Sequence, residues 1–319
     1  MFKQTLLTLA LTGLTTVALA EEWNMSLNEP DGNYHTQNAV KFAEDVARLS
    51  EGELTIKVTS SGALLKRPEL KRGVQKGLVP IGDVLISALG NEDAAYSADA
   101  VPLLATTFDD AEKLWDASKP LYDAKLDKSG LMSLYSVPWP PQGIYMKDEI
   151  TSGADFKGVK FRAYNASTAR LAELLGAVPA TISSSEISQA FSTGVISGMI
   201  TSPTTGVDSQ SWDFVKNYYD VKAFIPKNFV IVNKRAFAKL SEKSQKALTE
   251  AAKVAQTRGW EMAIKATTDA TDTLKENGMT VSGTPEKLAS DFKTVGATML
   301  EEWKESAGDD ATAIIKGMK

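Results

Sequence analysis

The sequence predicts an α/β protein of two domains, each with a parallel sheet that is faced by helices. Strand-like and helix-like segments alternate along the first half of the chain with short connections, which is the order typical of such a sheet. A second alternation begins near residue 157, and the chain becomes mostly helical after residue 235. Ligands of parallel sheets bind beyond the carboxyl ends of the strands, so we expect a ligand cleft between the domains.

The first domain is expected to begin with a strand at 23–28, where polar and apolar residues alternate. The next segment, 37–50, is an amphipathic helix because its apolar residues fall on one face, and Gly52 ends it. Further strands are expected at 54–62 and 79–86.

Three helices and one strand complete the first domain. The helix at 67–77 has a proline, Pro68, suited to a first turn. Two helices at 107–118 and 119–129 then precede a strand at 131–139.

The second domain is expected to repeat the alternation. Ser183 and Glu186 have the spacing of a capping box at the start of a helix. Residues 228–233 are apolar and β-branched, which predicts a buried strand, and the helices after Arg235 break near Leu240. The remaining segments expected here are a strand at 157–164, a helix at 166–175, an extended run at 177–183, a helix at 184–194 and an extended run at 195–203.

The first twenty residues are typical of a secretory signal peptide. Lys3 precedes a short apolar run, and Ala18-Leu19-Ala20 has the small residues of a cleavage site, so we expect cleavage after about Ala20 and export. No later window is apolar enough to span a bilayer. The expected organisation is a signal peptide at 1–20, domain I at 21–140 with part of the C-terminal region returning to it, domain II at 141–234, and a helical segment spanning both domains at 235–319.

Composition argues against several classes of function. The formal net charge of −5 argues against nucleic acid as a partner, because phosphate binding needs a basic surface. The sequence has no cysteine, which excludes thiol catalysis and thiolate metal sites. His35 is the only histidine, and most acid–base catalysts and zinc sites use histidine. We therefore predict no catalytic residue, no metal and no cofactor.

The stretch "FKGVKFRAYN", residues 156–165, ends a predicted strand with a cation. Val159 and Phe161 alternate inward, and Arg162 follows at the strand end. An edge-strand arginine paired with a neighbouring acid is one interpretation, and an anion site is the other. The other side chains expected at strand ends are Asn28, Ser87, Trp139, Thr201 and Asn233.

A series of spaced motifs runs from residue 152 to residue 203. Its residues are Asp155 to Gly158 with Lys160 and Arg162, then Gly176 to Pro179, then Ser185, Glu186, Ala190 and Gly194, and finally Gly198 and Pro203. This series resembles the solute-binding proteins of tripartite ATP-independent periplasmic (TRAP) transporters, of the dicarboxylate-binding-protein type. With further likeness at 39–58 and 233–252, the resemblance covers nearly all of the chain after the signal peptide.

The resemblance implies a two-domain α/β periplasmic binding protein with a long helix behind both domains and a ligand in the cleft between them. In that family an arginine at the position of Arg162 forms a salt bridge with the ligand carboxylate. A guanidinium suits this role because its planar fork matches a carboxylate in two places. The implied partners are a small organic acid and the membrane subunits of the transporter.

Three departures from the family pattern bear on the ligand. Thr201-Ser202-Pro203 replaces the usual asparagine and proline, so we expect the hydroxyl of Thr201 or Ser202 to stand in, and we favour Ser202 because it precedes the proline. Tyr145 lies near the position where members that bind sialic or some dicarboxylic acids have a second arginine. Ser184 and Ser188 replace aromatic positions and should enlarge the pocket. We therefore expect one cation, Arg162, in the cleft and a monocarboxylate ligand, whose body could be aromatic or apolar.

The candidate ligand-binding residues are polar or aromatic side chains near these strand ends. Each aromatic residue could instead belong to the core. They are Arg162, Asn28, Tyr34, Ser87, Trp139, Tyr145, Asn165, Ser184, Ser202, Trp212 and Phe229.

Two other functions stay open at this point. A zwitterionic or amine ligand could be held by aromatic side chains and a carboxylate. An exported hydrolase would need an acid–base pair, and Glu186 already has a structural role in the capping box.

Overall fold

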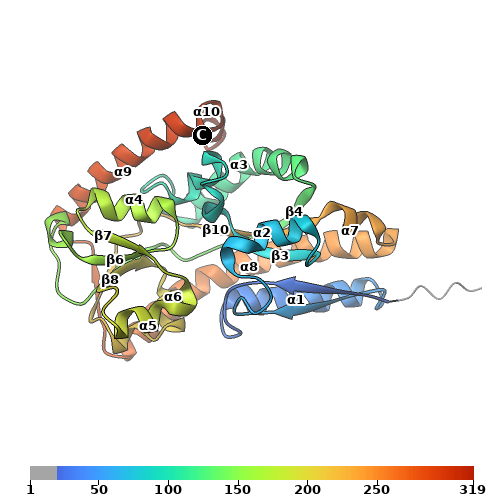
Figure 1. Cartoon of the computed structure of the whole chain (residues 1–319), viewed down its shortest axis with the longest axis horizontal. Coiled ribbons are helices and arrows are strands. Elements are labelled where there is room, and N and C mark those ends of the chain that lie inside the picture. The colour runs from blue at the N-terminus through green and yellow to red at the C-terminus, as the bar shows by residue number, and fades with distance from the viewer. Residues whose placement is uncertain (1–19) are drawn as a thin grey trace, which may run out of the picture.

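The computed structural model describes residues 20–319, so the predicted signal peptide lies almost entirely outside the described residues. Two sheets of five and six strands lie side by side, and helices cover them (Figure 1). The α/β class and the division into two sheet-based parts agree with the prediction. Both sheets are mixed and not parallel, however, because each contains a strand that runs against its neighbours.

The first sheet has the strand order β2-β1-β3-β10-β4. β1 pairs in parallel with β2 and β3, whereas β10 is antiparallel to β3 and β4. In the sequence, β10 follows most of the strands of the second sheet. The chain therefore returns to the first sheet from the second, and β10 runs antiparallel to its neighbours there. The strands are β1 Glu21–Ser26, β2 Leu54–Thr59, β3 Ile81–Leu85, β4 Leu131–Pro138 and β10 Lys227–Asn233.

The helices on this sheet are α1 Tyr34–Leu49, α2 Arg67–Lys76 and α3 Phe108–Lys128, with 3₁₀ turns η1 Ile86–Leu89 and η2 Ala94–Ala100. The prediction of two helices at 107–118 and 119–129 was wrong, because α3 is continuous through Pro120. Leu114 and Trp115 before the proline and Tyr122 and Leu126 after it are all buried. Packing of that face outweighs the backbone hydrogen bond that proline removes.

The second sheet has the order β11-β9-β5-β8-β6-β7. β5, β9 and β11 were not predicted, because their four-residue sequences show no clear alternation, and β11 is only partly buried. The strands are β5 Gly143–Met146, β6 Lys160–Ala163, β7 Val178–Thr181, β8 Gly198–Thr201, β9 Asn217–Asp220 and β11 Thr280–Gly283.

The expected helix at 184–194 is a 3₁₀ turn, η4, followed by the short helix α5, and the predicted capping box of Ser183 and Glu186 is present. The elements that accompany the second sheet are η3 Gly153–Phe156, α4 Ala166–Leu174, η4 Ser184–Glu186, α5 Ile187–Ser192, α6 Pro203–Asp208 and η5 Ser211–Asp213.

The C-terminal helices join the two parts. They are α7 Lys234–Lys239, α8 Glu242–Glu276, α9 Glu286–Ala307 and α10 Asp309–Gly317, and the break predicted at Leu240 separates α7 from α8. α8 packs against α1 and β4 of the first part and against α6 and β11 of the second (Figure 1). None of the helices between residues 20 and 319 is long and apolar enough to cross a membrane.

The chain passes from the first sheet to the second between β4 and β5, near residue 140, but the sheets do not follow the boundary expected at residue 234. β10 was expected in the second domain but lies in the first sheet, and β11 comes from the C-terminal segment but joins the second. All seven residues of β10 are buried, so the strand is central to the first core. The chain therefore crosses between the parts after β4, before β10 and within α8, and it returns along α9 to α10, which packs on α3 of the first part.

Candidate functional site

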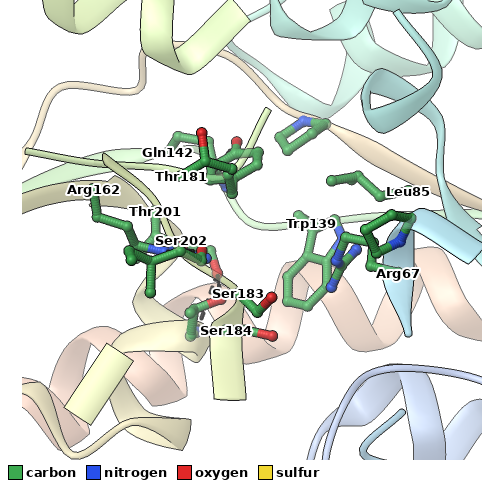
Figure 2. A pocket seen from close by; sticks show the side chains of 15 residues that line it. Arg67, Leu85, Trp139, Gln142, Arg162, Thr181, Ser183, Ser184, Thr201 and Ser202 are labelled. Atoms are coloured by element: carbon green, nitrogen blue, oxygen red, sulfur yellow. Dashed lines mark hydrogen bonds between the residues drawn. The ribbon is translucent and has the colours of Figure 1, made fainter. Parts of the chain in front are cut away.

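A pocket of about 120 Å³ lies between the two parts, at strand ends of both sheets. Figure 2 shows Arg162, Thr201 and Ser202 on one side of the pocket and Arg67 and Leu85 on the other. Its wall is formed by Arg67, Pro68, Leu85, Trp139, Gln142, Arg162, Tyr164, Thr181, Ile182, Ser183, Ser184, Thr201, Ser202, Thr205 and Pro226.

Arg162 is a buried cation that lacks an acidic partner among residues 20–319. β6 carries its side chain into the pocket wall, where the residue is 3% exposed. Its Nε donates a hydrogen bond to the Ile182 carbonyl at 3.0 Å, while Nη1 is buried without a hydrogen-bond partner in the described structure. Burial lowers the pKa of Arg162 to about 10, so the group is still charged at neutral pH. The arrangement favours an anion in the pocket, because a buried charge is costly until it is paired.

Tyr164 and Gln142 support the arginine from the same side of the pocket. The guanidinium carbon of Arg162 lies 5.3 Å from the ring centroid of Tyr164, a cation–π contact. The Tyr164 hydroxyl donates to Gln142 Oε1 at 3.1 Å, and Gln142 Nε2 donates to the Pro140 carbonyl at 2.9 Å. These bonds fix the positions of both side chains in the wall.

Ser202 organises the hydroxyl-rich part of the wall. It precedes α6, and its Oγ accepts a hydrogen bond from the Thr205 backbone N–H at 3.1 Å. The same oxygen lies 2.9 Å from the Thr204 hydroxyl and 3.0 Å from the Thr205 hydroxyl. Ser202 therefore takes part in a local network at the pocket as well as lining it.

Trp139 forms the aromatic part of the wall. Its Nε1 donates to Asn228 Oδ1 at 2.9 Å, and its ring centroid lies 4.3 Å from that of His35. His35 is buried, neither ring nitrogen has a hydrogen-bond partner in the described structure, and burial lowers its pKa to about 4. The only histidine is thus a neutral packing partner of Trp139 and not part of the pocket wall.

The expectation of one cation in the cleft was wrong, because Arg67 also lines the pocket. Arg67 is the first residue of α2, and its Nη2 lies 2.8 Å from Oε1 of the buried Glu29. From the sequence, Arg67 was expected only to begin a helix. Its place shortly after the end of β2 was the available signal, since strand ends face the crevice.

Tyr145 lies beneath the wall and not in it. The ring is fully buried against Tyr218, with centroids 4.7 Å apart, and the hydroxyl donates to the Ser202 carbonyl at 3.1 Å. Tyr145 therefore supports Ser202 from behind.

Phe229 and Trp212 also lie away from the pocket wall. Phe229 points into the first core beside Tyr96, because successive residues of β10 face opposite sides of the sheet. Trp212 packs beside a small core of the second part. Among the predicted residues the wall contains Arg162, Trp139, Ser184 and Ser202.

Two of the remaining predicted residues form a hydrogen bond between the two parts. Asn165 caps α4 with its side-chain oxygen, and its Nδ2 donates to Ser87 Oγ in η1 at 3.0 Å. A second bond between the parts joins Asn33 Nδ2 to Asp208 Oδ2 at 2.7 Å. These contacts can form only when the two parts are close together.

Asn28 and Tyr34 also lie outside the pocket wall. Asn28 donates its backbone N–H to Glu29 Oε2, and Tyr34 donates its hydroxyl to the Pro138 carbonyl. Tyr34 instead lines a second hollow, between α1, α6 and α8. Asn233, named only as a strand end, caps α7.

Comparison with known proteins identifies clear relatives. A family model described as bacterial extracellular solute-binding protein, family 7 (DctP), matches residues 25–306. DctP7 of Bordetella pertussis, an extracytoplasmic solute receptor binding pyroglutamic acid, is 52% identical, with a TM-score of 0.93 over 94% of this chain and 99% of that one.

Two further solved structures are similar along the same length. DctP6 of Bordetella pertussis, which also binds pyroglutamic acid, is 40% identical with a TM-score of 0.92 over 93% of this chain and 99% of that one. A TRAP solute-binding protein from a marine metagenome, of an unidentified microbe, was solved with co-purified pyroglutamate. It is 37% identical with a TM-score of 0.92 over 94% of this chain and 99% of that one.

Proposed function

The chain belongs to family 7 of the bacterial extracellular solute-binding proteins, the solute-binding proteins of TRAP transporters, and on that premise we propose that it captures a pyroglutamate-like monocarboxylate. The ligand carboxylate pairs with Arg162 in the pocket between the two parts. The loaded protein then delivers the acid to the membrane subunits of the transporter. Export to the periplasm, with cleavage after about Ala20, belongs to the same proposal.

The single observation that carries the proposal is the buried guanidinium of Arg162, which has no acidic partner in the part of the chain that the structure describes. Its free Nη1 and its position in the pocket wall offer a carboxylate a charged partner at low exposure. A carboxylate that enters would replace an uncompensated charge with a charge-assisted hydrogen-bonded pair. The same guanidinium disfavours a cationic ligand, because like charges repel strongly at low dielectric.

The rest of the wall suits a small ring with one amide. Trp139, Leu85 and Pro226 offer apolar surface, while Ser183, Ser184 and Thr181 offer hydroxyl groups. Pyroglutamate combines an apolar ring edge, a lactam that can donate and accept hydrogen bonds, and one carboxylate. Pockets of apolar walls with a few placed polar groups are typical of such ligands. Three similar proteins that bind this acid support the assignment.

The ligand class is tested by thermal-shift screening against pyroglutamate, other monocarboxylates, sugar acids and amines. Ligands that bind only the folded state raise its melting midpoint, so we expect pyroglutamate to produce a large shift and amines none. At a ligand concentration a hundred times its Kd, the added stability is about 2.7 kcal/mol. Shifts with amines alone would contradict the proposal.

Closure of the two parts over the ligand is part of this mechanism, and the bond between Asn165 and Ser87 is expected to stabilise it. In Ser87→Ala the Asn165 Nδ2 group loses its acceptor, which costs about 0.5–1.5 kcal/mol in the closed state. We expect ligand to dissociate a few times faster with little change in the association rate, as measured by stopped-flow fluorescence.

The matched control is Ser192→Ala, which removes a hydroxyl that bonds only within α5. It should leave both rate constants unchanged. Equal dissociation rates for wild type and Ser87→Ala would mean that this bond does not hold the parts together.

A hydrolase is disfavoured, since the family consists of solute-binding receptors. The capping box already accounts for Glu186, whose Oε2 accepts the Ser183 backbone N–H at 3.2 Å.

A further inference from the structure

The pocket holds two arginines that come from different parts of the molecule. Arg67 begins α2 beside the first sheet, and Arg162 lies in β6 of the second, one residue before that strand ends; Figure 2 shows them on opposite sides of the pocket. Burial is the main cause of the lowered pKa of Arg162, and the positive charge of Arg67 is a smaller cause. The two guanidinium groups are thus close enough to influence each other, and a pair of cations would suit a dicarboxylate.

Glu29 neutralises one of these two charges. Its Oε1 lies 2.8 Å from Nη2 of Arg67, and its Oε2 accepts the backbone N–H of Asn28 at 3.1 Å. The Glu29 backbone carbonyl accepts hydrogen bonds from Ser61 and Thr36. Glu29 is 2% exposed, so both carboxylate oxygens and the backbone are fixed in place.

The charged side chains around the pocket can therefore neutralise one carboxylate of a ligand and not two. Arg162 contributes one positive charge, while Arg67 and Glu29 cancel each other. The nearby Asp83 is also buried, and burial is the main cause that raises the pKa of its carboxyl well above the usual range.

We propose that Glu29 makes the pocket selective for singly charged acids by holding Arg67 in a neutral pair, so that a dicarboxylate is rejected. This inference rests on the proposed function and names the selectivity of that same site. A second ligand carboxylate would meet the carboxylate of Glu29 near Arg67 at low dielectric, with no free cation to pair it. Specificity of this kind arises because unfavourable electrostatic interactions weaken the binding of the competing ligand.

The pair could instead serve only to fasten the loop after β1 to α2. That alternative predicts a loss of stability on Glu29→Gln without any change in ligand preference. Charge neutralisation predicts a change in preference, because Gln keeps the shape and a hydrogen-bond acceptor for Arg67 but removes the negative charge.

The experiment compares two acids of equal heavy-atom count by isothermal titration calorimetry, after any co-purified ligand has been removed. Pyroglutamate carries one carboxylate, and glutarate carries two. In wild type we expect pyroglutamate to bind and glutarate to bind weakly or not at all. In Glu29→Gln the glutarate affinity should rise about ten-fold or more relative to pyroglutamate, since Arg67 becomes free to pair with the second carboxylate.

Glu92→Gln is the matched control, because Glu92 pairs with Lys71 on the exposed surface and its loss changes the net charge equally. It should leave the preference unchanged. Arg67→Gln supplies a second test that does not depend on the Glu29→Gln protein folding. It leaves Glu29 unpaired and should weaken pyroglutamate binding about ten-fold or more, and the double variant with Glu29→Gln should restore it.

The outcomes separate this inference from the proposed function. A wild-type protein that binds neither acid overturns the proposed function and this inference with it. A wild type that binds pyroglutamate, with an unchanged preference in Glu29→Gln or no restoration in the double variant, overturns only the role of Glu29.

Discussion

Replacing Arg162 with methionine is expected to abolish measurable binding of pyroglutamate while the protein stays folded. Methionine keeps much of the side-chain stem and removes the charge that pairs with the ligand carboxylate. Loss of one partner of a buried charge pair costs about 2–5 kcal/mol, which is about thirty-fold to several thousand-fold in Kd. Isothermal titration calorimetry of the ligand-free variant measures this directly.

The same substitution should not lower the stability of the ligand-free protein. Burial lowers the pKa of Arg162 to about 10, which means that the folded state carries the cost of a poorly solvated charge. We therefore expect an equal or higher melting midpoint for Arg162→Met without ligand. Replacing a functional group that is strained or desolvated in the free protein commonly raises the stability of that protein.

Arg170→Met is the matched control, because Arg170 is an exposed arginine that pairs with Glu302 and Glu173 on the surface. It should bind pyroglutamate as wild type does. Full affinity in Arg162→Met would show that the ligand carboxylate is held elsewhere in the pocket.

Replacing Trp139 with alanine is expected to weaken both the fold and the ligand site. The indole packs on His35, donates a hydrogen bond to Asn228 and forms the pocket wall. Truncation of a buried aromatic residue costs about 3–5 kcal/mol, and we expect the melting midpoint to fall by roughly 10 °C. Ligand affinity should fall on the order of ten-fold, because apolar contact with the ring is lost.

Two further variants separate the causes. Trp139→Phe keeps an aromatic ring against His35 but leaves Asn228 Oδ1 without its donor, so it should cost about 1–2 kcal/mol of stability. Trp212→Ala makes the same truncation at a partly buried tryptophan away from the pocket and should leave ligand affinity unchanged. An affinity loss in Trp212→Ala as large as that in Trp139→Ala would contradict this division of roles.

Several features could be predicted because they depend on residues close together in the sequence. The capping box at Ser183 and Glu186, the break at Leu240 and the buried strand at 228–233 all follow from local spacing and side-chain type. Arg162 could be placed at the end of a strand by the same reasoning. The continuous helix α3 shows the limit of local signals, because Pro120 argues for a break that the packing of Trp115 and Tyr122 overrides.

The residues that could not be placed from the sequence depend on contacts between distant segments. Arg67 follows Glu29 by thirty-eight positions, and only the packing of α2 against β3, the neighbour of β1, brings their charges together. Phe229 could be assigned to a strand, but which face of that strand meets the core depends on the neighbouring strands. Tyr145 was not assigned to any predicted strand, although it lies in β5.

The sequence by itself determined the class of fold, the family, and the position of one arginine at a strand end, since periodicity, caps and spaced motifs are properties of the chain alone. Tertiary structure decided that the arginine is buried without an acid, that a second arginine shares its pocket, and that Glu29 neutralises it. Burial and charge pairing depend on all the residues that surround a side chain in the folded protein, and those residues come from segments far apart in the sequence.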